Sequence, residues 1–316
     1  MSDRKSRVFG PVPSRRLGRS LGVDLVPFKT CSYDCIYCQL GRTTCLTTER
    51  REWVPTDEII EDIKAKACDT PAPDYITFSG SGEPTLHSGL GRILDFIRSE
   101  TDIPIAVLTN GSLLWMPEVC EAVAGADLVV PSLDAGDAET FEIINRPAPG
   151  IDFEDMVRGL RELAAARKGE MWLEVFLAGG VNTGEAQLED MARIARGIGP
   201  DRIQLNTVVR PPAEEFAKVV SCEEMERIVA VFGPKAEVVA DYRGTHEKGE
   251  FAARREHVMD LLGRRPCTVD DIAAGLAMHV NEVVKYVDEL ARLGSIKTED
   301  RNGKTFYFAA DAPGEV

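Results

Sequence analysis

The stretch Thr30-Cys31-Ser32-Tyr33-Asp34-Cys35-Ile36-Tyr37-Cys38 places three cysteines within eight residues, in the spacing C-x3-C-x2-C. Three thiolates this close in the chain can bind one face of an iron–sulfur cube. Because a 4Fe–4S cluster normally takes four cysteine ligands, three ligands leave one iron with an open coordination position. Cys31, Cys35 and Cys38 are therefore the predicted metal ligands, and the open iron is where a substrate or cofactor would bind.

Two other interpretations of the cysteines stay open at this stage. A structural zinc site needs four ligands, and Cys45 is the nearest candidate for the fourth, since no histidine occurs in this loop. A second cluster could combine Cys45 with more distant cysteines. The single residues Cys68, Cys120, Cys222 and Cys267 are typical of small buried hydrophobic side chains.

The composition is that of an ordinary globular protein. The 316 residues include 37 Lys and Arg against 52 Asp and Glu, a net charge of −15, and 44% are hydrophobic. No run approaches the roughly 18 apolar residues of a membrane helix, and the Arg-rich first 20 residues lack the apolar core of a secretory signal. We expect a cytoplasmic protein that does not bind membranes. The acidic balance argues against nucleic acid covering the whole surface, although a local basic patch could still bind it.

Short apolar β-rich runs alternate with amphipathic helical patterns. The expected strands are Leu21–Phe28, Tyr75–Phe78, Ile105–Leu108, Leu128–Pro131, Trp172–Leu177 and Ile203–Val208. The expected helices between them are Asp57–Ala67, Gly89–Ser99, Pro117–Ala124, Phe153–Arg167 and Glu185–Gly197. Such alternation predicts parallel strands and an α/β fold. Six units predict a partial (β/α)6 TIM-like barrel, in which sites form at the C-terminal ends of the strands.

Polar or glycine-rich segments follow every expected strand. After the cysteine loop come Gly80, Ser81, Gly82 and Glu83, then Asn110, then Ser132 and Asp134, then Gly179–Asn182, and finally Arg210. Arg146 lies beyond the fourth strand, and either arginine could bind an anion or form a surface ion pair. The repetition of such segments beside three cysteines indicates a site at this end of the barrel.

These residues resemble the radical S-adenosylmethionine (SAM) superfamily. The resemblance rests on the cysteine motif, with Tyr37 just before its last cysteine, and on Gly80-Ser81-Gly82-Glu83-Pro84. The latter is similar to the GGEP motif of that superfamily, with Ser81 in place of the second glycine. The similarity covers about residues 9–212.

The resemblance implies a 4Fe–4S cluster with SAM as co-substrate on the open iron. An electron from a flavodoxin or ferredoxin then cleaves SAM, and the 5′-deoxyadenosyl radical removes a hydrogen from the substrate. The resemblance also implies the SAM contacts, while it assigns no catalytic side chain. The methionine ammonium would meet Gly80, Ser81, Gly82 and Glu83; the ribose or methionine carboxylate would meet Asn110, Ser132 and Asp134; the adenine would lie near Tyr37 and Asn182.

The segments Phe9–Arg16 and Cys38–Gly41 are similar to a branch near the wyosine-tRNA base synthases and the nitrogenase-cofactor maturation enzymes. A neighbouring branch does not transfer a reaction. The substrate therefore stays open among an RNA base, a peptide or protein side chain, and a small metabolite.

The C-terminal part has a different pattern. Helices are expected over Arg254–Leu262, Thr268–Leu276 and Asn281–Leu293, followed by a hairpin around Asn302-Gly303. Three helices and a hairpin resemble a winged helix-turn-helix domain. From Arg254 to Phe308 nine Lys and Arg are balanced by nine Asp and Glu, so nucleic acid, a peptide and a protein all stay open as its partner.

The expected organisation is a radical SAM barrel over residues 1–242, a linker over 243–250, a winged-helix-like domain over 251–310 and a tail over 311–316. The alternative function is an iron–sulfur redox-sensing transcriptional regulator that binds DNA through the winged helix.

Overall fold

A computed structural model describes residues 6–14, 16–67, 73–208, 212–239, 255, 257–259, 261–263, 266–276, 278–301 and 304–310. The chain forms two compact units, Met1–Ala240 and Asp241–Val316. None of the helices in the described ranges has the length and apolar content that a bilayer crossing requires.

The N-terminal unit is built on one eight-stranded sheet in the order β1-β2-β5-β6-β7-β8-β9-β10. Its strands are β1 (Val8–Ser14), β2 (Gly18–Val23), β5 (Tyr75–Phe78), β6 (Ile105–Thr109), β7 (Leu128–Pro131), β8 (Glu170–Leu177), β9 (Arg202–Thr207) and β10 (Ala236–Val238). All neighbouring pairs are parallel except β1 with β2. This parallel sheet is consistent with the expected partial barrel.

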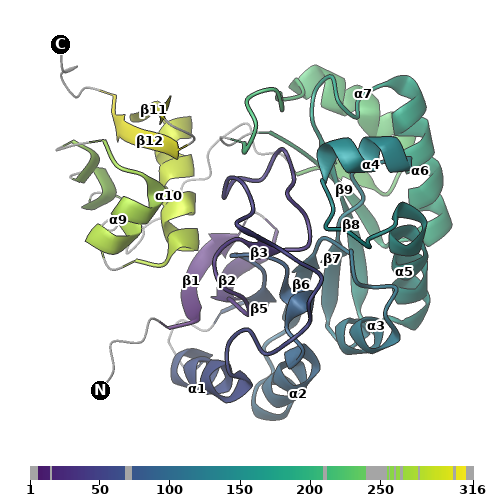
Figure 1. Ribbon diagram of the computed structural model, residues 1–316, viewed down its shortest axis with the longest axis horizontal. Helices are drawn as coiled ribbons and strands as arrows, with labels where there is room; N and C mark the ends of the chain where they lie inside the picture. The colour runs from purple at the N-terminus through teal and green to yellow at the C-terminus, as the bar shows by residue number, and fades with distance from the viewer. Residues whose placement is uncertain are drawn as a thin grey trace. The chain divides into compact units, whose positions relative to one another are not determined.

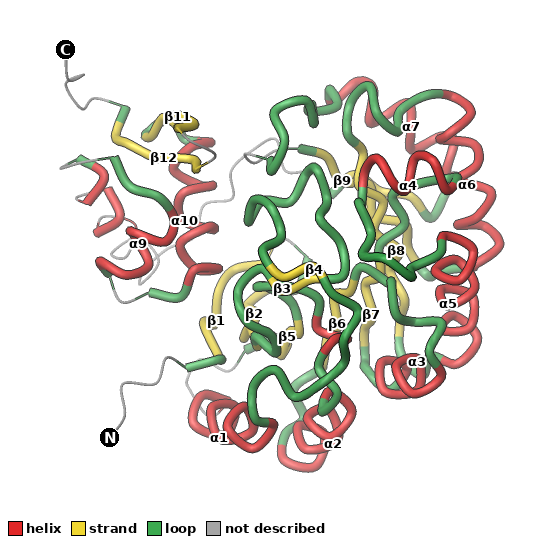
Figure 2. Tube along the Cα trace, viewed as in Figure 1, coloured by secondary structure: helices red, strands yellow, loops and turns green. Residues whose placement is uncertain are grey.

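Helices cover the outer side of the sheet, as Figure 1 shows. They are α1 (Thr56–Ala67), α2 (Leu90–Glu100), α3 (Pro117–Ala124), α5 (Phe153–Ala166), α6 (Glu185–Ile198) and α7 (Cys222–Phe232), with the shorter α4 (Ala138–Ile144) after β7. Long loops follow the strands (Figure 2), and one of them contains the short pair β3 (Thr30–Cys31) and β4 (Cys45–Leu46).

Besides the short pair β3 and β4, the elements β1, β10, α4 and α7 were not expected. Strand β1 contains Pro11 and Pro13, which a strand tolerates at the edge of a sheet, and β1 pairs only with β2. Strand β10 has three residues and helix α4 has seven, too few for a periodic pattern. Helix α7 begins after Ser221, whose side chain accepts a hydrogen bond from the Glu224 N–H at 3.2 Å. The first expected strand was placed too late, since β2 ends at Val23.

The two faces of the strands pack differently because side chains alternate along a strand. Val107, Val129 and Leu173 belong to the large core that includes the helices. The neighbouring residues on the opposite face form a smaller apolar cluster inside the curved sheet, made of Leu17, Ala106, Leu128, Val130 and Trp172. Two and four residues after Trp172, the same face of β8 carries Glu174 and Phe176. Toward its carboxyl end the inner face of β8 therefore carries a carboxylate and an aromatic ring beyond the apolar cluster.

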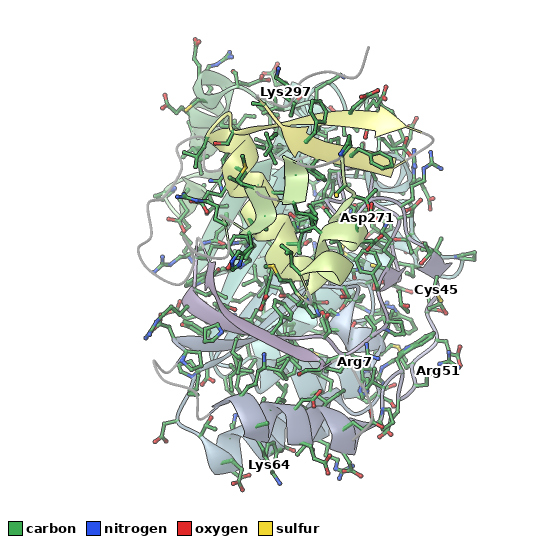
Figure 3. The ribbon with its side chains drawn as sticks, turned by 90° about the vertical axis from the view of Figure 1, so that its left-hand side faces the viewer. Arg7, Cys45, Arg51, Lys64, Asp271 and Lys297 are labelled. Atoms are coloured by element: carbon green, nitrogen blue, oxygen red, sulfur yellow. The ribbon has the colours of Figure 1, made fainter. Side chains whose placement is uncertain are left out.

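The C-terminal unit contains α9 (Val269–Gly275), α10 (Val280–Arg292) and an antiparallel pair, β11 (Ile296–Arg301) with β12 (Lys304–Ala309). Asp271 on α9 and Lys297 on β11 are labelled in Figure 3. Thr268 and Asp271 form a capping box at the start of α9, and Gly294 just beyond α10 has a φ of 68°. The Asn302-Gly303 turn and part of the expected helix Arg254–Leu262 lie outside the described residues, and the winged-helix assignment stays a prediction.

Candidate functional site

The cysteine loop begins directly after β2 and is held against the loop after β5. Thr30 forms a parallel bridge with Gly82, the Glu83 N–H donates to the Thr30 carbonyl at 3.1 Å, and the Lys29 N–H donates to that of Ser81 at 2.6 Å. A Cβ atom on Gly82 would lie 1.8 Å from the Thr30 oxygen. Glycine is therefore required here so that the two backbones can meet beside Cys31.

Ser81 and Gly80 shape the same loop. The Ser81 hydroxyl donates to Asp24 at 2.7 Å and its N–H donates to the other Asp24 oxygen at 3.0 Å, so the serine side chain is directed into the protein. Gly80 has a φ of 120°, which side chains other than hydrogen rarely tolerate. Both residues fix the backbone of the segment that was expected to meet the SAM ammonium.

Two asparagine side chains donate to sulfur atoms of the cysteine motif. The Asn110 amide nitrogen lies 3.6 Å from the Cys31 sulfur, and that of Asn145 lies 3.4 Å from the Cys35 sulfur. The Tyr33 backbone N–H also donates to Cys31, at 3.5 Å. Amide donors aimed at sulfur are the outer contacts expected around metal-bound thiolates.

Burial raises the pKa of the Cys31 thiol to about 12, with Glu83 as the next cause. Burial also raises the pKa of Cys35 and of Cys38. Thiols in such surroundings lose their protons when a metal cation supplies the compensating positive charge, because a coordinating thiol is deprotonated outright.

The three cysteines are a donor set of the kind that holds an iron–sulfur cluster. Over the ranges that the structure describes, no group of three or more His, Cys, Asp or Glu side chains is placed to hold one ion. In a cube each cysteine binds a different iron, so the sulfurs need not converge on one point. Cys31, Cys35 and Cys38, on one loop and with amides directed at two of their sulfurs, could hold such a cluster.

Glu83 joins the loop after β5 to the end of β6 through its buried carboxylate. One oxygen accepts from the Thr109 hydroxyl at 2.6 Å, and from the Thr85 hydroxyl and N–H at 2.7 and 3.0 Å. The other accepts from the Asn110 N–H at 2.7 Å. Burial raises the pKa of Glu83, while these donors oppose that change. The carboxylate thus holds Asn110 beside Cys31, a role that the motif alone did not predict.

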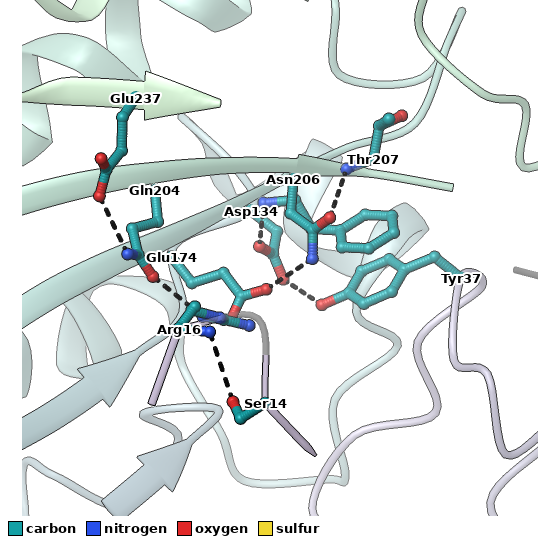
Figure 4. A network of polar contacts seen from close by, with 10 residues as sticks. Ser14, Arg16, Tyr37, Asp134, Glu174, Gln204, Asn206, Thr207 and Glu237 are labelled. Atoms are coloured by element: carbon teal, nitrogen blue, oxygen red, sulfur yellow. Dashed lines mark hydrogen bonds and ion pairs between the residues drawn. The ribbon is translucent and has the colours of Figure 1, made fainter. Parts of the chain in front are cut away.

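Asp134 lies at the centre of a second group, drawn in Figure 4. Its carboxylate accepts hydrogen bonds from the Tyr37 hydroxyl, from the Asn145 amide at 2.8 Å and from the Phe176 N–H at 2.9 Å. Burial raises the pKa of Asp134 to about 6. The Tyr37 ring stacks on Phe176, with ring centroids 3.7 Å apart. Tyr37 and Asp134, which the sequence placed in one site, are therefore in contact.

Asn182 is fully buried and its side chain is committed to backbone groups. Its amide nitrogen donates to the carbonyls of Asp134 and Phe176 at 2.8 and 2.7 Å, and its oxygen accepts from the Ala178 N–H at 2.8 Å. Ser132 is half-buried and its N–H donates to the Thr109 carbonyl at 3.1 Å. Asn182 therefore positions the end of β8 next to Asp134, instead of offering donors to a ligand.

A polar network covers the inner face of β8 and β9 below Asp134 (Figure 4). The Glu174 carboxylate accepts from Arg16 at 2.8 Å and from the Asn206 amide at 2.9 Å. Arg16 also donates to Gln204 at 3.1 Å, and Gln204 donates to Glu237 at 3.1 Å. Along β8 and β9, Glu174 and Asn206 lie between the level of Trp172 in the apolar cluster and the carboxyl ends of these strands.

Several of these residues escaped the sequence reasoning. Asn145, Glu174 and Asn206 had no motif around them, although the alternation along β8 placed Glu174 on the face of Trp172. Arg146 has a φ of 48° and forms an ion pair with Glu214 at 2.5 Å, one of the two roles considered for it. Arg210 lies outside the described residues.

Comparison with known proteins shows the family to which this chain belongs. A family model described as "Radical SAM superfamily" matches residues 25–195. The chain is 41% identical over 304 residues to a protein named "GTPase Obg" from Brachyspira hyodysenteriae, covering 95% of this chain but 45% of that protein. It is 32% identical over 308 residues to a UPF0026 protein from Methanocaldococcus jannaschii, covering 95% of this chain and 94% of that one.

Among solved structures, a radical SAM methyltransferase from Sphaerobacter thermophilus is similar with a TM-score of 0.56 and 20% identity. The similarity covers 69% of this chain and 65% of the methyltransferase. At this identity it shows a common fold. The chain spans less than half of the Brachyspira protein that it matches.

Proposed function

Because the chain belongs to the radical SAM superfamily and to the UPF0026 proteins, we propose that it is an enzyme that cleaves SAM reductively at a 4Fe–4S cluster. The observation that carries the proposal is the C-x3-C-x2-C loop at the carboxyl ends of parallel strands, with amides 3.4 and 3.6 Å from two of its sulfurs. Members of the superfamily bind such a cluster and SAM.

In this proposal Cys31, Cys35 and Cys38 hold the cluster. When bound, the cluster supplies one electron from a flavodoxin or ferredoxin to SAM, which yields a 5′-deoxyadenosyl radical that takes a hydrogen from the substrate. The Gly80–Gly82 backbone and Asn110 line the side of the site next to Cys31, and they would bind the methionine part of SAM.

Ser132 and Asp134 follow β7, Tyr37 of the cysteine loop is hydrogen-bonded to Asp134, and these three residues would contact the ribose and adenine. The substrate would lie against the inner face near Glu174 and Asn206, since the interior below is filled by the apolar cluster of Trp172 and its neighbours.

The C-terminal unit would bind the substrate or a partner. On α10 the cation Arg292 is paired with Asp288 at 2.6 Å, and Arg255 is paired with Glu289 at 3.3 Å. Cations that are neutralised within the unit contribute less to phosphate binding, which favours a peptide or protein over nucleic acid as the partner of α10.

The proposal is tested by anaerobic reconstitution of the full chain with iron and sulfide, followed by dithionite and SAM. We expect about four irons per chain and release of 5′-deoxyadenosine, measured by chromatography. Replacing Cys31, Cys35 and Cys38 by alanine should abolish both. Cys45→Ala is the matched control, because Cys45 lies on the neighbouring strand β4 (Figure 3) and outside the motif.

A cluster-bearing protein that releases no 5′-deoxyadenosine, but whose DNA affinity changes on oxidation, would instead support a redox-sensing regulator. The substrate class is tested by comparing modified nucleosides and peptides of a deletion strain with those of its parent. Loss of one modified species, restored by the wild-type gene and not by the triple cysteine variant, identifies the substrate.

A further inference from the structure

Asparagine side chains contact two of the three cysteine sulfurs, and we propose that Asn145 and Asn110 set the reduction potential of the cluster. This inference rests on the proposed function. Asn145 is 2% exposed and its amide nitrogen is shared between the Cys35 sulfur, at 3.4 Å, and Asp134, at 2.8 Å. Asn110 is shared between the Cys31 sulfur, at 3.6 Å, and the Ser32 hydroxyl, at 2.9 Å.

The orientation of each amide follows from its other contacts. The Asn110 oxygen accepts the Ser112 N–H at 3.0 Å, so its NH2 group is the end that faces Cys31. An inverted Asn145 amide would place its oxygen against the Asp134 carboxylate, which offers no donor when ionised. Both NH2 groups are therefore directed at sulfur.

The backbone of each asparagine is also fixed. The Asn145 N–H donates to the Phe141 carbonyl at 2.9 Å, at the end of α4, and its carbonyl accepts the Asp34 N–H of the cysteine loop at 3.0 Å. The Asn110 N–H is held by Glu83 at 2.7 Å. The two donors are thus held in place by the end of α4 and by Glu83, and also by Asp34 and Ser32 of the cysteine loop itself.

The direction of the effect follows from electrostatics. Reduction adds one electron, from a low-potential flavodoxin or ferredoxin type of donor, and we treat it as adding no proton. N–H dipoles aimed at sulfur stabilise the added negative charge and raise the potential. The Asp134 carboxylate on the far side of Asn145 acts in the opposite sense. The dry surroundings strengthen both effects.

The test is an EPR-monitored redox titration of the reconstituted full chain. For Asn145→Leu we expect the equilibrium constant for reduction by dithionite to fall about tenfold, or about 59 mV for one electron. Asn110→Leu should shift it in the same direction by less, because its contact is longer. Asp134→Asn should raise the potential. Asn206→Ala, which alters the polar network on β9, is the control and should leave the potential unchanged.

An Asn145→Leu cluster with full iron content and the wild-type potential would overturn the inference, as would a lower potential in Asp134→Asn. If the Asn145→Leu protein binds too little iron for a redox titration, pulsed EPR of the wild-type cluster with 15N-labelled asparagine tests the inference instead. A coupling from an amide nitrogen supports the inference and its absence overturns it. Wild-type protein that assembles no cluster would contradict the proposed function itself, so the two failures are distinguishable.

Discussion

Gly82→Ala should disconnect the cysteine loop from the sheet. Gly82 does not have a positive φ, so alanine is compatible with its backbone conformation. Only the steric contact of the added Cβ atom therefore matters. The added Cβ would lie 1.8 Å from the Thr30 oxygen, where real contacts stay above 3.0 Å. The two segments must therefore separate by at least 1.2 Å, the difference between these distances.

That displacement exceeds what the local hydrogen bonds tolerate. The Glu83–Thr30 bond of 3.1 Å would be stretched beyond hydrogen-bond range, and the neighbouring Lys29–Ser81 bond of 2.6 Å would be strained with it. At about 0.5–1.5 kcal/mol for each bond, the free energy of unfolding should fall by about 1–3 kcal/mol. Cys31 follows Thr30 directly, so iron binding should weaken as well.

Urea unfolding and iron content after reconstitution measure the two effects. Gly91→Ala is the matched control: Gly91 lies inside α2, and its Cβ would meet the Ala122 Cβ at an ordinary 3.4 Å. Alanine there should raise stability by about 0.5–1 kcal/mol. A Gly82→Ala protein with wild-type stability and full iron loading would refute the close-packing argument.

Three further predictions concern side chains around the site. Glu83→Gln should lower the free energy of urea unfolding by about 1–3 kcal/mol, because an NH2 group would face the donors of Thr85, Thr109 or Asn110; a loss below about 0.5 kcal/mol would contradict this. Asn182→Ala should cost about 2–3 kcal/mol through its three backbone contacts, measured in the same way, and an unchanged unfolding midpoint would speak against the clamp. Burial lowers the pKa of His87 below its usual 6.5, and its two ring nitrogens contact the Val54 carbonyl and the Gly89 N–H, which requires a neutral ring. Because the unfolded state then binds more protons than the folded state, the free energy of unfolding should fall as the pH drops below about 6.5. The fall should be smaller in His87→Gln. Parallel pH profiles of the two proteins would exclude His87 as the cause.

The sequence predicted the repeating part of the fold well. Six strands and five helices were located, since each has either a buried apolar run or a clear helical period. Strand β1 was missed because its prolines oppose strand propensity, and only its position at the sheet edge makes them acceptable. Helix α7 could have been found, because Ser221 and Glu224 have the spacing of a capping box.

The sequence predicted some residues of the site and missed others, for a physical reason. A motif identifies residues whose spacing along the chain matters, such as the three cysteines and Gly82. Asn145 reaches Cys35 from 110 positions away, through the turn that ends α4, and no local pattern marks such a contact. Glu174 and Asn206 contact each other across β8 and β9 and belong to the same class.

The same distinction explains why several expected ligand contacts also act inside the protein. Glu83 cannot be understood from its charge alone, because both of its oxygens are used to hold Thr109 and Asn110 at neighbouring strand ends. Asn110 in turn contacts the Cys31 sulfur. Because the Glu83 carboxylate is hydrogen-bonded to Thr85, Thr109 and Asn110, a change at Glu83 would move the Asn110 amide and so alter its contact with the Cys31 sulfur. The position of the amide donor beside Cys31 therefore depends on a carboxylate at the end of the adjacent strand, since β5 and β6 are neighbours in the parallel sheet.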